Sequence, residues 1–208
     1  IEYFDKVLEL DKENTQALEY KAHSLFLNRY FEEAIEIYMY LVSNKENDSN
    51  SWNDLGVALM EYGLRLNRWY EGKLNYLGHD QLRESMKCFD SALRINHDNI
   101  CSMFNLALLY RSMDNFFAAS VYYNRALEID EKNIYVLINA ANNYLLMDLF
   151  SESKELYKKA IIIDPDFMKK FFDENSYLIP TDGHYDLMFL KMGVELYPNS
   201  PIIHSEFI

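Results

Sequence analysis

Residues 52–59 read Trp-Asn-Asp-Leu-Gly-Val-Ala-Leu, and the spacing within this stretch indicates what kind of fold the chain adopts. Trp52, Leu55, Gly56 and Leu59 stand at i, i+3, i+4 and i+7, which places them on one face of a helix. A glycine inside a helix costs about 1 kcal/mol relative to alanine. We therefore expect Gly56 to allow the close approach of a neighbouring helix.

The small and large apolar residues of this stretch recur along the chain with a fixed period. Tyr110 and Tyr123 are followed by Tyr144 and Tyr157, each 34 residues further on. The repeating unit contains two helical patterns, and the first has the spacing of residues 52–59. The first patterns are Leu18-Ala22-Leu25, Trp52-Leu55-Gly56-Leu59, Met103-Leu106-Ala107-Tyr110 and Leu137-Ala140-Ala141-Tyr144. The second patterns are Ala34-Tyr38-Leu41, Ser85-Phe89-Ala92, Ala119-Tyr123-Ala126 and Ser153-Tyr157-Ala160.

With these residues the chain resembles the tetratricopeptide-repeat family, whose unit is a 34-residue pair of antiparallel helices. The resemblance implies an all-α fold, a right-handed superhelical solenoid in which stacked helix pairs bury one continuous core. Large residues such as Phe89, Tyr123 and Tyr157 then fill the space opposite the small ones. We expect a single solenoid over residues 1–208, made of a partial repeat at 1–14, repeats at 15–48, 49–99, 100–133 and 134–167, a degenerate repeat at 168–200 and the start of a further helix at 201–208.

The second repeat is longer than the period. Ala34 and Ser85 hold equivalent positions but lie one period and 17 further residues apart, which places an insertion at about residues 64–80 and the start of the next helix near Gln81. The insertion is either an interface, with the aromatic and arginine content of hot spots, or an extension of both helices by a turn or two. The residues of the candidate interface are Arg65, Arg68, Trp69, Tyr70, Lys73 and Tyr76.

In this family the first helix of each repeat lines the concave groove, so the template predicts which side chains face a ligand. Asp54, Asn105 and Asn139 hold the position where members that bind extended peptides often carry a ladder of asparagines. An amide group can pair with a peptide backbone of any sequence. Coincidence is the competing interpretation, because asparagine is frequent throughout the chain. The expected groove residues are Tyr20, His23, Asn53, Asp54, Phe104, Asn105, Arg111, Tyr135, Asn139 and Asn142.

A second family pattern is not matched. Repeat domains that dock the C-termini of chaperones hold two carboxylates with Lys, Asn and Arg side chains on successive first helices. The matching positions here include Glu19, His23, Asp54 and Cys101. An acidic groove would repel such a tail, so the sequence disfavours this kind of docking.

The composition limits the classes of partner and the compartment. A net charge of −13 argues against nucleic acid and anionic membranes and favours basic partners. No apolar run approaches the roughly 18 residues of a membrane-spanning helix, and there is no signal-peptide pattern. Cys88 and Cys101 do not form a disulfide framework. We therefore expect a cytoplasmic or nucleocytoplasmic protein that is not secreted.

Motifs that carry chemistry are missing from the sequence. The five histidines are scattered, and none has zinc-ligand spacing to a cysteine. There is no glycine-rich phosphate loop, no G-x-S-x-G and no H-E-x-x-H motif. We therefore predict no catalytic residue, no metal site, no cofactor and no enzymatic activity.

The leading hypothesis for function is a non-catalytic protein–protein interaction scaffold. It would bind a peptide or helical segment of a partner in the concave groove, within a larger assembly. A second hypothesis is a substrate-recruiting arm of an enzyme whose catalytic domain lies outside this chain. The family includes fusions of this kind. A third is self-association through the apolar end at residues 201–208, because terminal repeats usually need polar capping.

Overall fold

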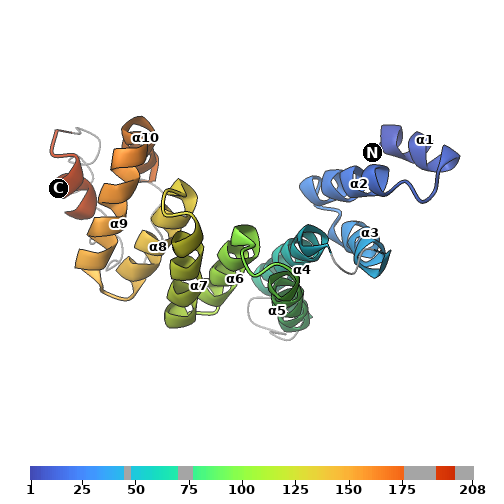
Figure 1. The fold of residues 1–208 in the computed structure, drawn as a ribbon, viewed down its shortest axis with the longest axis horizontal. Helices are drawn as coiled ribbons and strands as arrows, with labels where there is room; N and C mark the ends of the chain where they lie inside the picture. The colour runs from blue at the N-terminus through green and yellow to red at the C-terminus, as the bar shows by residue number, and fades with distance from the viewer. Residues whose placement is uncertain (45–47, 70–76, 176–190, 200–208) are drawn as a thin grey trace. The chain divides into compact units, whose positions relative to one another are not determined.

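The computed structural model describes residues 1–44, 48–69, 77–175 and 191–199, and these ranges contain helices and turns but no strand. The chain forms two compact units, residues 1–109 and residues 110–208, and each is considered by itself. The predicted all-α class is confirmed for the described residues. In chain order the helices are α1 (Glu2–Leu10), α2 (Thr15–Leu27), α3 (Phe31–Asn44), α4 (Ser49–Trp69), α5 (Leu77–Ile95), α6 (Ile100–Ser112), α7 (Phe116–Ile129), α8 (Ile134–Leu146), α9 (Phe150–Ile163) and α10 (Pro165–Asn175), with a further helical segment at 191–196 (Figure 1).

Asparagine is the N-cap residue of three helices that stand first in a predicted repeat. Asn14, Asn99 and Asn133 each accept a hydrogen bond from the backbone N–H three residues further on, over 3.0, 2.9 and 3.3 Å. An N-cap of this kind satisfies one of the N–H groups that the first turn of a helix leaves free. Asn99 and Asn133 are 34 residues apart, so the cap recurs with the period of the sequence.

The turns between the two helices of a repeat also recur. Asp114 and Asp148, one period apart, have left-handed backbone conformations with φ of 57° and 59°. Aspartate is among the residue types that tolerate this region. The equivalent turn between α2 and α3 holds Arg29 at φ 66°. Arginine has no local side-chain hydrogen bond to favour that conformation, so its presence there calls for a separate explanation.

The close helix approach predicted at Gly56 is confirmed. A Cβ atom added to Gly56 would lie 2.6 Å from Cε1 and 2.8 Å from Cδ1 of Phe89, well inside van der Waals contact. Phe89 is fully buried, and so are Tyr123 and Tyr157, which hold the same position in later repeats. These large side chains therefore pack where the repeat template places them. Glycine is required at position 56 because the ring of Phe89 occupies the space of a side chain.

The insertion lengthens both helices of the second repeat. The helix α4 has 21 residues, whereas α2, α6 and α8 each have 13. The helix α5 has 19 residues, whereas α3, α7 and α9 each have 14. The next helix thus begins at Leu77 and not near Gln81, which corrects the expected boundary. Residues 64–69 and 77–80 are helix extensions, while Tyr70, Lys73 and Tyr76 and the side chains of Arg68 and Trp69 lie outside the described part.

Gly63 explains why the two extensions can run side by side. It stands one period after Arg29, where the first repeat turns, but α4 continues through it to Trp69. A Cβ atom on Gly63 would lie 2.9 Å from the backbone oxygen of Gly78 and 2.9 Å from Cδ2 of Leu82. The absent side chain therefore lets the end of α4 approach the start of α5.

Each of the four predicted full repeats contains two helices in the chain order expected for helix pairs. Because the chain divides into two units, a single solenoid over residues 1–208 stays a prediction. The apolar end at 201–208 lies outside the described residues.

Candidate functional site

Three groove positions of the first unit share one exposed surface. The pKa of Asp54 on α4 is raised by loss of hydration, and its neighbours Asp48 and Glu19 raise it further, while a hydrogen bond from Asn53 and the charge of His23 lower it. Glu19 and His23 come from α2, so the two helices present these groups to the same region. We call Glu19, Tyr20, His23 and Asp54 the acidic face.

A buried tyrosine lies beneath the acidic face. Burial raises the pKa of Tyr38 on α3, and the negative charges of Asp54 and Glu19 raise it further. Asp54 and His23 are nevertheless exposed, and Tyr20 is 53% exposed. The Tyr20 ring stacks on Phe4 of α1, with 5.8 Å between the ring centroids. The face therefore combines negative charge with an accessible aromatic surface.

Asn53 is a groove position that the fold uses internally. Its side chain is only 9% exposed, and its carbonyl oxygen accepts hydrogen bonds from Ser102 Oγ at 3.2 Å and Asn105 Nδ2 at 3.0 Å. Its own Nδ2 donates to Asp54 Oδ1 at 3.3 Å. Asn53 thus joins α4 to α6 and orients two predicted ligand-facing groups. The periodicity of α4 alone could not reveal this, because both donors to its oxygen lie on α6.

The α6 positions of the first unit are half-buried. No described residue donates a hydrogen bond to the side-chain carbonyl oxygen of Asn105. Phe104 precedes it on the same helix and is also partly accessible. The amide nitrogen of Asn105 therefore holds the side chain in place, whereas its oxygen has no donor among the described residues.

The polar groove positions of the second unit already have hydrogen-bond partners within that unit. Arg111 Nη1 donates to Asn139 Oδ1 at 3.3 Å, and Asn139 Nδ2 donates to the backbone oxygen of Tyr135 at 2.9 Å. Asn142 accepts a hydrogen bond from the buried Tyr157 hydroxyl. Tyr135 is 64% exposed. The aromatic ring is thus the more accessible of these groups, whereas the amides of Asn139 and Asn142 already have protein partners.

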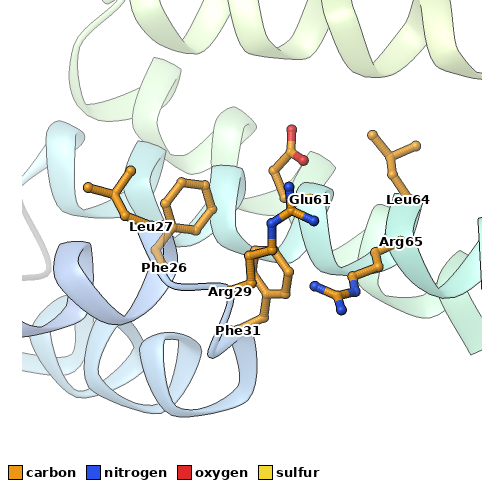
Figure 2. Close-up of a pocket in the computed structure, with 7 residues that line it drawn as sticks. All are labelled: Phe26, Leu27, Arg29, Phe31, Glu61, Leu64 and Arg65. Atoms are coloured by element: carbon orange, nitrogen blue, oxygen red, sulfur yellow. The ribbon is translucent and has the colours of Figure 1, made fainter.

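A mixed polar and apolar pocket of about 560 Å³ lies in the first unit, beside the acidic face. It is lined by the α2–α3 turn and α4, and Figure 2 shows the side chains that each of these two segments contributes. Its apolar walls are Phe26, Leu27, Phe31 and Leu64, and its charged groups are Arg29, Glu61 and Arg65. Arg65 was predicted from the insertion. Sequence reasoning missed Arg29, and the one signal for it was a non-glycine residue at a turn position.

The described ranges hold no group of three or more His, Cys, Asp or Glu side chains arranged to bind a metal ion. None of the helices in those ranges combines the length and apolar composition that crossing a membrane requires.

Asp54→Asn should stabilise the protein at neutral pH. The raised pKa means that the folded state favours the protonated carboxyl, so the ionised form weakens folding once the pH exceeds the ordinary value of about 3.9. An uncharged amide removes this penalty and the repulsion by Glu19 and Asp48. The gain, measured by urea unfolding between acidic and neutral pH, should shrink as the pH falls. Asp90→Asn on the exposed surface of α5 is the control, and equal midpoints for Asp54→Asn and the unmutated protein at neutral pH would contradict the assignment.

Comparisons with known proteins agree with this architecture. Residues 102–133 match the tetratricopeptide-repeat family model. The thermophilic TPR protein TTC0263 of Thermus thermophilus has a similar structure, with a TM-score of 0.70, 18% identity, and coverage of 84% of this chain and 87% of that chain. A search of curated proteins finds no significant sequence match.

Two further solved structures are informative. YrrB, a TPR protein with an unusual peptide-binding site, has a TM-score of 0.59 and 16% identity, covering 99% of this chain and 98% of that one. The APC/C hetero-tetramer Cut9–Hcn1 contains a chain with a TM-score of 0.64 and 13% identity, covering 99% of this chain and 38% of that one. At these identities the likeness is one of fold, and it confirms the predicted solenoid of helix pairs.

Proposed function

We propose that this chain, which matches the tetratricopeptide-repeat model at residues 102–133 and shares the fold of solved TPR proteins, is a non-catalytic scaffold that binds a segment of a partner protein. The fold generally serves protein–protein interaction. The peptide-binding site named for YrrB and the hetero-tetramer of Cut9 with Hcn1 are in keeping with such a role. The binding surface that we propose is the acidic face of the first unit, together with Phe104 and Asn105.

The observation that carries this proposal is the excess of negative charge on the acidic face. Desolvation and the charges of Asp48 and Glu19 together keep the pKa of Asp54 above its ordinary value, although His23 acts against them. A cationic side chain of a partner would relieve this repulsion. The exposed ring of Tyr20 adds apolar area and can also receive a cation on its face. We therefore propose that the partner segment is basic.

The polar groups of this surface are held in place before any ligand arrives. The Asn53 side chain is buried and hydrogen-bonded to both Asp54 and Asn105. Binding therefore loses little side-chain entropy at these positions, because their rotamers are already restricted. The carbonyl oxygen of Asn105 can accept a backbone N–H of the segment, which gives affinity that does not depend on its sequence.

Selection of short random peptides displayed on phage tests this proposal. The enriched peptides should carry an excess of lysine and arginine. Asp54→Lys should weaken their binding by about tenfold or more, because reversing a charge beside a cation changes attraction into repulsion. Glu36→Lys is the matched control, because Glu36 is an exposed acid on α3 of the same unit. Fluorescence anisotropy at two salt concentrations provides the measurement.

Two results would contradict the proposal. One is enrichment of acidic or uncharged peptides in the selection. The other is an equal effect of Asp54→Lys and Glu36→Lys on the affinity, which would mean that net charge alone governs binding.

A further inference from the structure

The pocket beside the acidic face exists because the insertion lengthens α4. The first repeat turns at Arg29, whereas α4 continues past the equivalent position, Gly63. Leu64 and Arg65 are the first residues beyond that position, and both line the pocket together with the α2–α3 turn. A repeat of ordinary length would end before these two side chains. The insertion therefore contributes two of the side chains that line this pocket.

The apolar part of the pocket is a packed aromatic cluster. Phe31, which is 7% exposed, meets Phe26 edge-on with 5.7 Å between the ring centroids. On its other side, Phe31 lies 6.0 Å from the ring of Tyr62 on α4. Tyr62 in turn donates a hydrogen bond to Glu32, which ties α4 to the start of α3. These contacts restrict the ring positions, so the pocket has a fixed apolar wall.

Two guanidinium groups reach the pocket, and neither has an acidic partner among the described residues. The Arg65 guanidinium lies over the Phe31 ring, 5.8 Å from its centroid, and its buried Nη1 has no hydrogen-bond acceptor in the described part of the chain. Arg29 is exposed at the turn, and Figure 2 shows its side chain directed toward α4. Neither arginine forms an ion pair with a described residue, although the chain carries a net charge of −13.

The same pocket contains one acid, Glu61 on α4, which is exposed. With two arginines and one glutamate, its formal charge is positive, in contrast to the adjoining acidic face. The unusual residue at the α2–α3 turn contributes one of the two positive charges, which accounts for arginine at a backbone position that favours glycine or aspartate. Its positive formal charge therefore distinguishes this pocket from the acidic face.

We propose that the pocket binds the carboxylate of an aspartate or glutamate side chain in the partner segment, next to an apolar residue of that segment. Guanidinium groups bind carboxylates through paired, charge-assisted hydrogen bonds. The apolar neighbour would pack on the Phe26 and Phe31 rings. That the carboxylate belongs to a partner protein rests on the proposed function. That the pocket prefers a carboxylate rests on the residues that line it.

A small probe tests this preference without any peptide. 3-Phenylpropionate supplies a carboxylate and an apolar ring, and 3-phenylpropionamide has the same shape without the charge. In titrations followed by two-dimensional ¹H–¹⁵N NMR, the carboxylate should shift the signals of Phe31, Leu64 and Arg65, and it should bind at least about tenfold more tightly than the amide. Equal binding of the two compounds would overturn the proposal.

Three substitutions in the pocket should change the affinity for 3-phenylpropionate in opposite directions. Arg65→Gln and Arg29→Gly should each weaken binding of the carboxylate by about tenfold, and Arg29→Gly suits the left-handed turn, so the fold is retained. Glu61→Gln should tighten binding roughly two- to fivefold by removing a like charge. Tighter binding cannot arise from damage to the fold.

The matched control is Arg83→Gln, which removes an exposed arginine of α5 that pairs with Asp80. It should leave the affinity for 3-phenylpropionate unchanged. If Glu61→Gln does not tighten binding, or if Arg65→Gln acts no differently from Arg83→Gln, the pocket is not a carboxylate site. If the phage selection failed, the proposal of a basic partner segment would be wrong, but the binding of 3-phenylpropionate to the pocket would not be affected. The two proposals can therefore fail separately.

Discussion

Phe89→Ala is expected to lower the free energy of unfolding of the first unit by about 3–5 kcal/mol, the range for truncating a buried phenylalanine. The ring is fully buried and lies against Gly56, so its removal opens a cavity between α4 and α5. Urea unfolding followed by circular dichroism measures the loss. Met39→Ala is the control, because Met39 is 57% exposed on α3 of the same unit and should change stability by less than about 0.5 kcal/mol.

Substitutions at Gly56, which lies against the Phe89 ring, test the same contact from the other helix. In the unmutated protein, Gly56→Ala should destabilise by about 1 kcal/mol or more, because the added Cβ would lie 2.6 Å from the Phe89 ring and overpacking outweighs the better helix propensity of alanine. In a Phe89→Leu background the same substitution should cost less or stabilise, since the planar ring is gone. A destabilisation by Gly56→Ala that is the same in both backgrounds would contradict the close contact.

Asn99→Ala is expected to lower the free energy of unfolding by about 2–4 kcal/mol, because it removes a helix cap and also leaves buried polar groups without hydrogen-bond partners. Asn99 accepts from the Ser102 N–H at 2.9 Å and donates to Ser49 Oγ at 2.6 Å. Ser49 in turn donates to the backbone oxygen of Ala92 at 3.0 Å. One amide thus links the start of α6 to α4 and, through Ser49, to the end of α5.

Asn133→Ala is the matched control, one period further along the chain. Asn133 caps α8 through the Val136 N–H at 3.3 Å, and among the described residues the other hydrogen bond of its amide goes to Asp130 in its own turn. Its loss should cost about 1 kcal/mol. Thermal and urea unfolding of the two variants should therefore differ clearly. Equal losses of stability in the two variants would mean that the hydrogen bonds from Asn99 to α4 contribute nothing. In a Ser49→Ala, Asn99→Ala double variant, the loss of stability should be smaller than the sum of the two single losses.

The packing of this protein could be predicted closely from its sequence, whereas the accessibility of its candidate site could not. Gly56 and Phe89 follow from a local period, because a small and a large residue at fixed template positions imply a close helix contact. Asn53 stands on the predicted groove side of α4, yet it is buried by Ser102 and Asn105 on α6. Those two residues lie 49 and 52 positions away, so no pattern within one helix predicts their contacts with Asn53.

The insertion illustrates the same limit. Its length and place could be read from the interval between Ala34 and Ser85. Whether it forms a loop or extends two helices depends on how Gly63 meets Gly78 and Leu82, which is a contact between two elements. Arg65 was expected to belong to an interface because of its residue type. Its place over the Phe31 ring, opposite Arg29, emerges only when α4 packs beside the first repeat.

The sequence by itself determined the 34-residue period, the all-α class, the small and large residues of the core and the negative charge of the surface. These properties are local or additive, and so they can be read from spacing and composition. Only the tertiary structure decided which of the predicted groove amides have protein partners, that the insertion extends α4 and α5, and that Arg29 and Arg65 share one pocket. Each of these depends on contacts between different elements, from Gly63 against Gly78 to Asn53 against Asn105, where the position of one helix against another sets the burial and pairing of the polar groups.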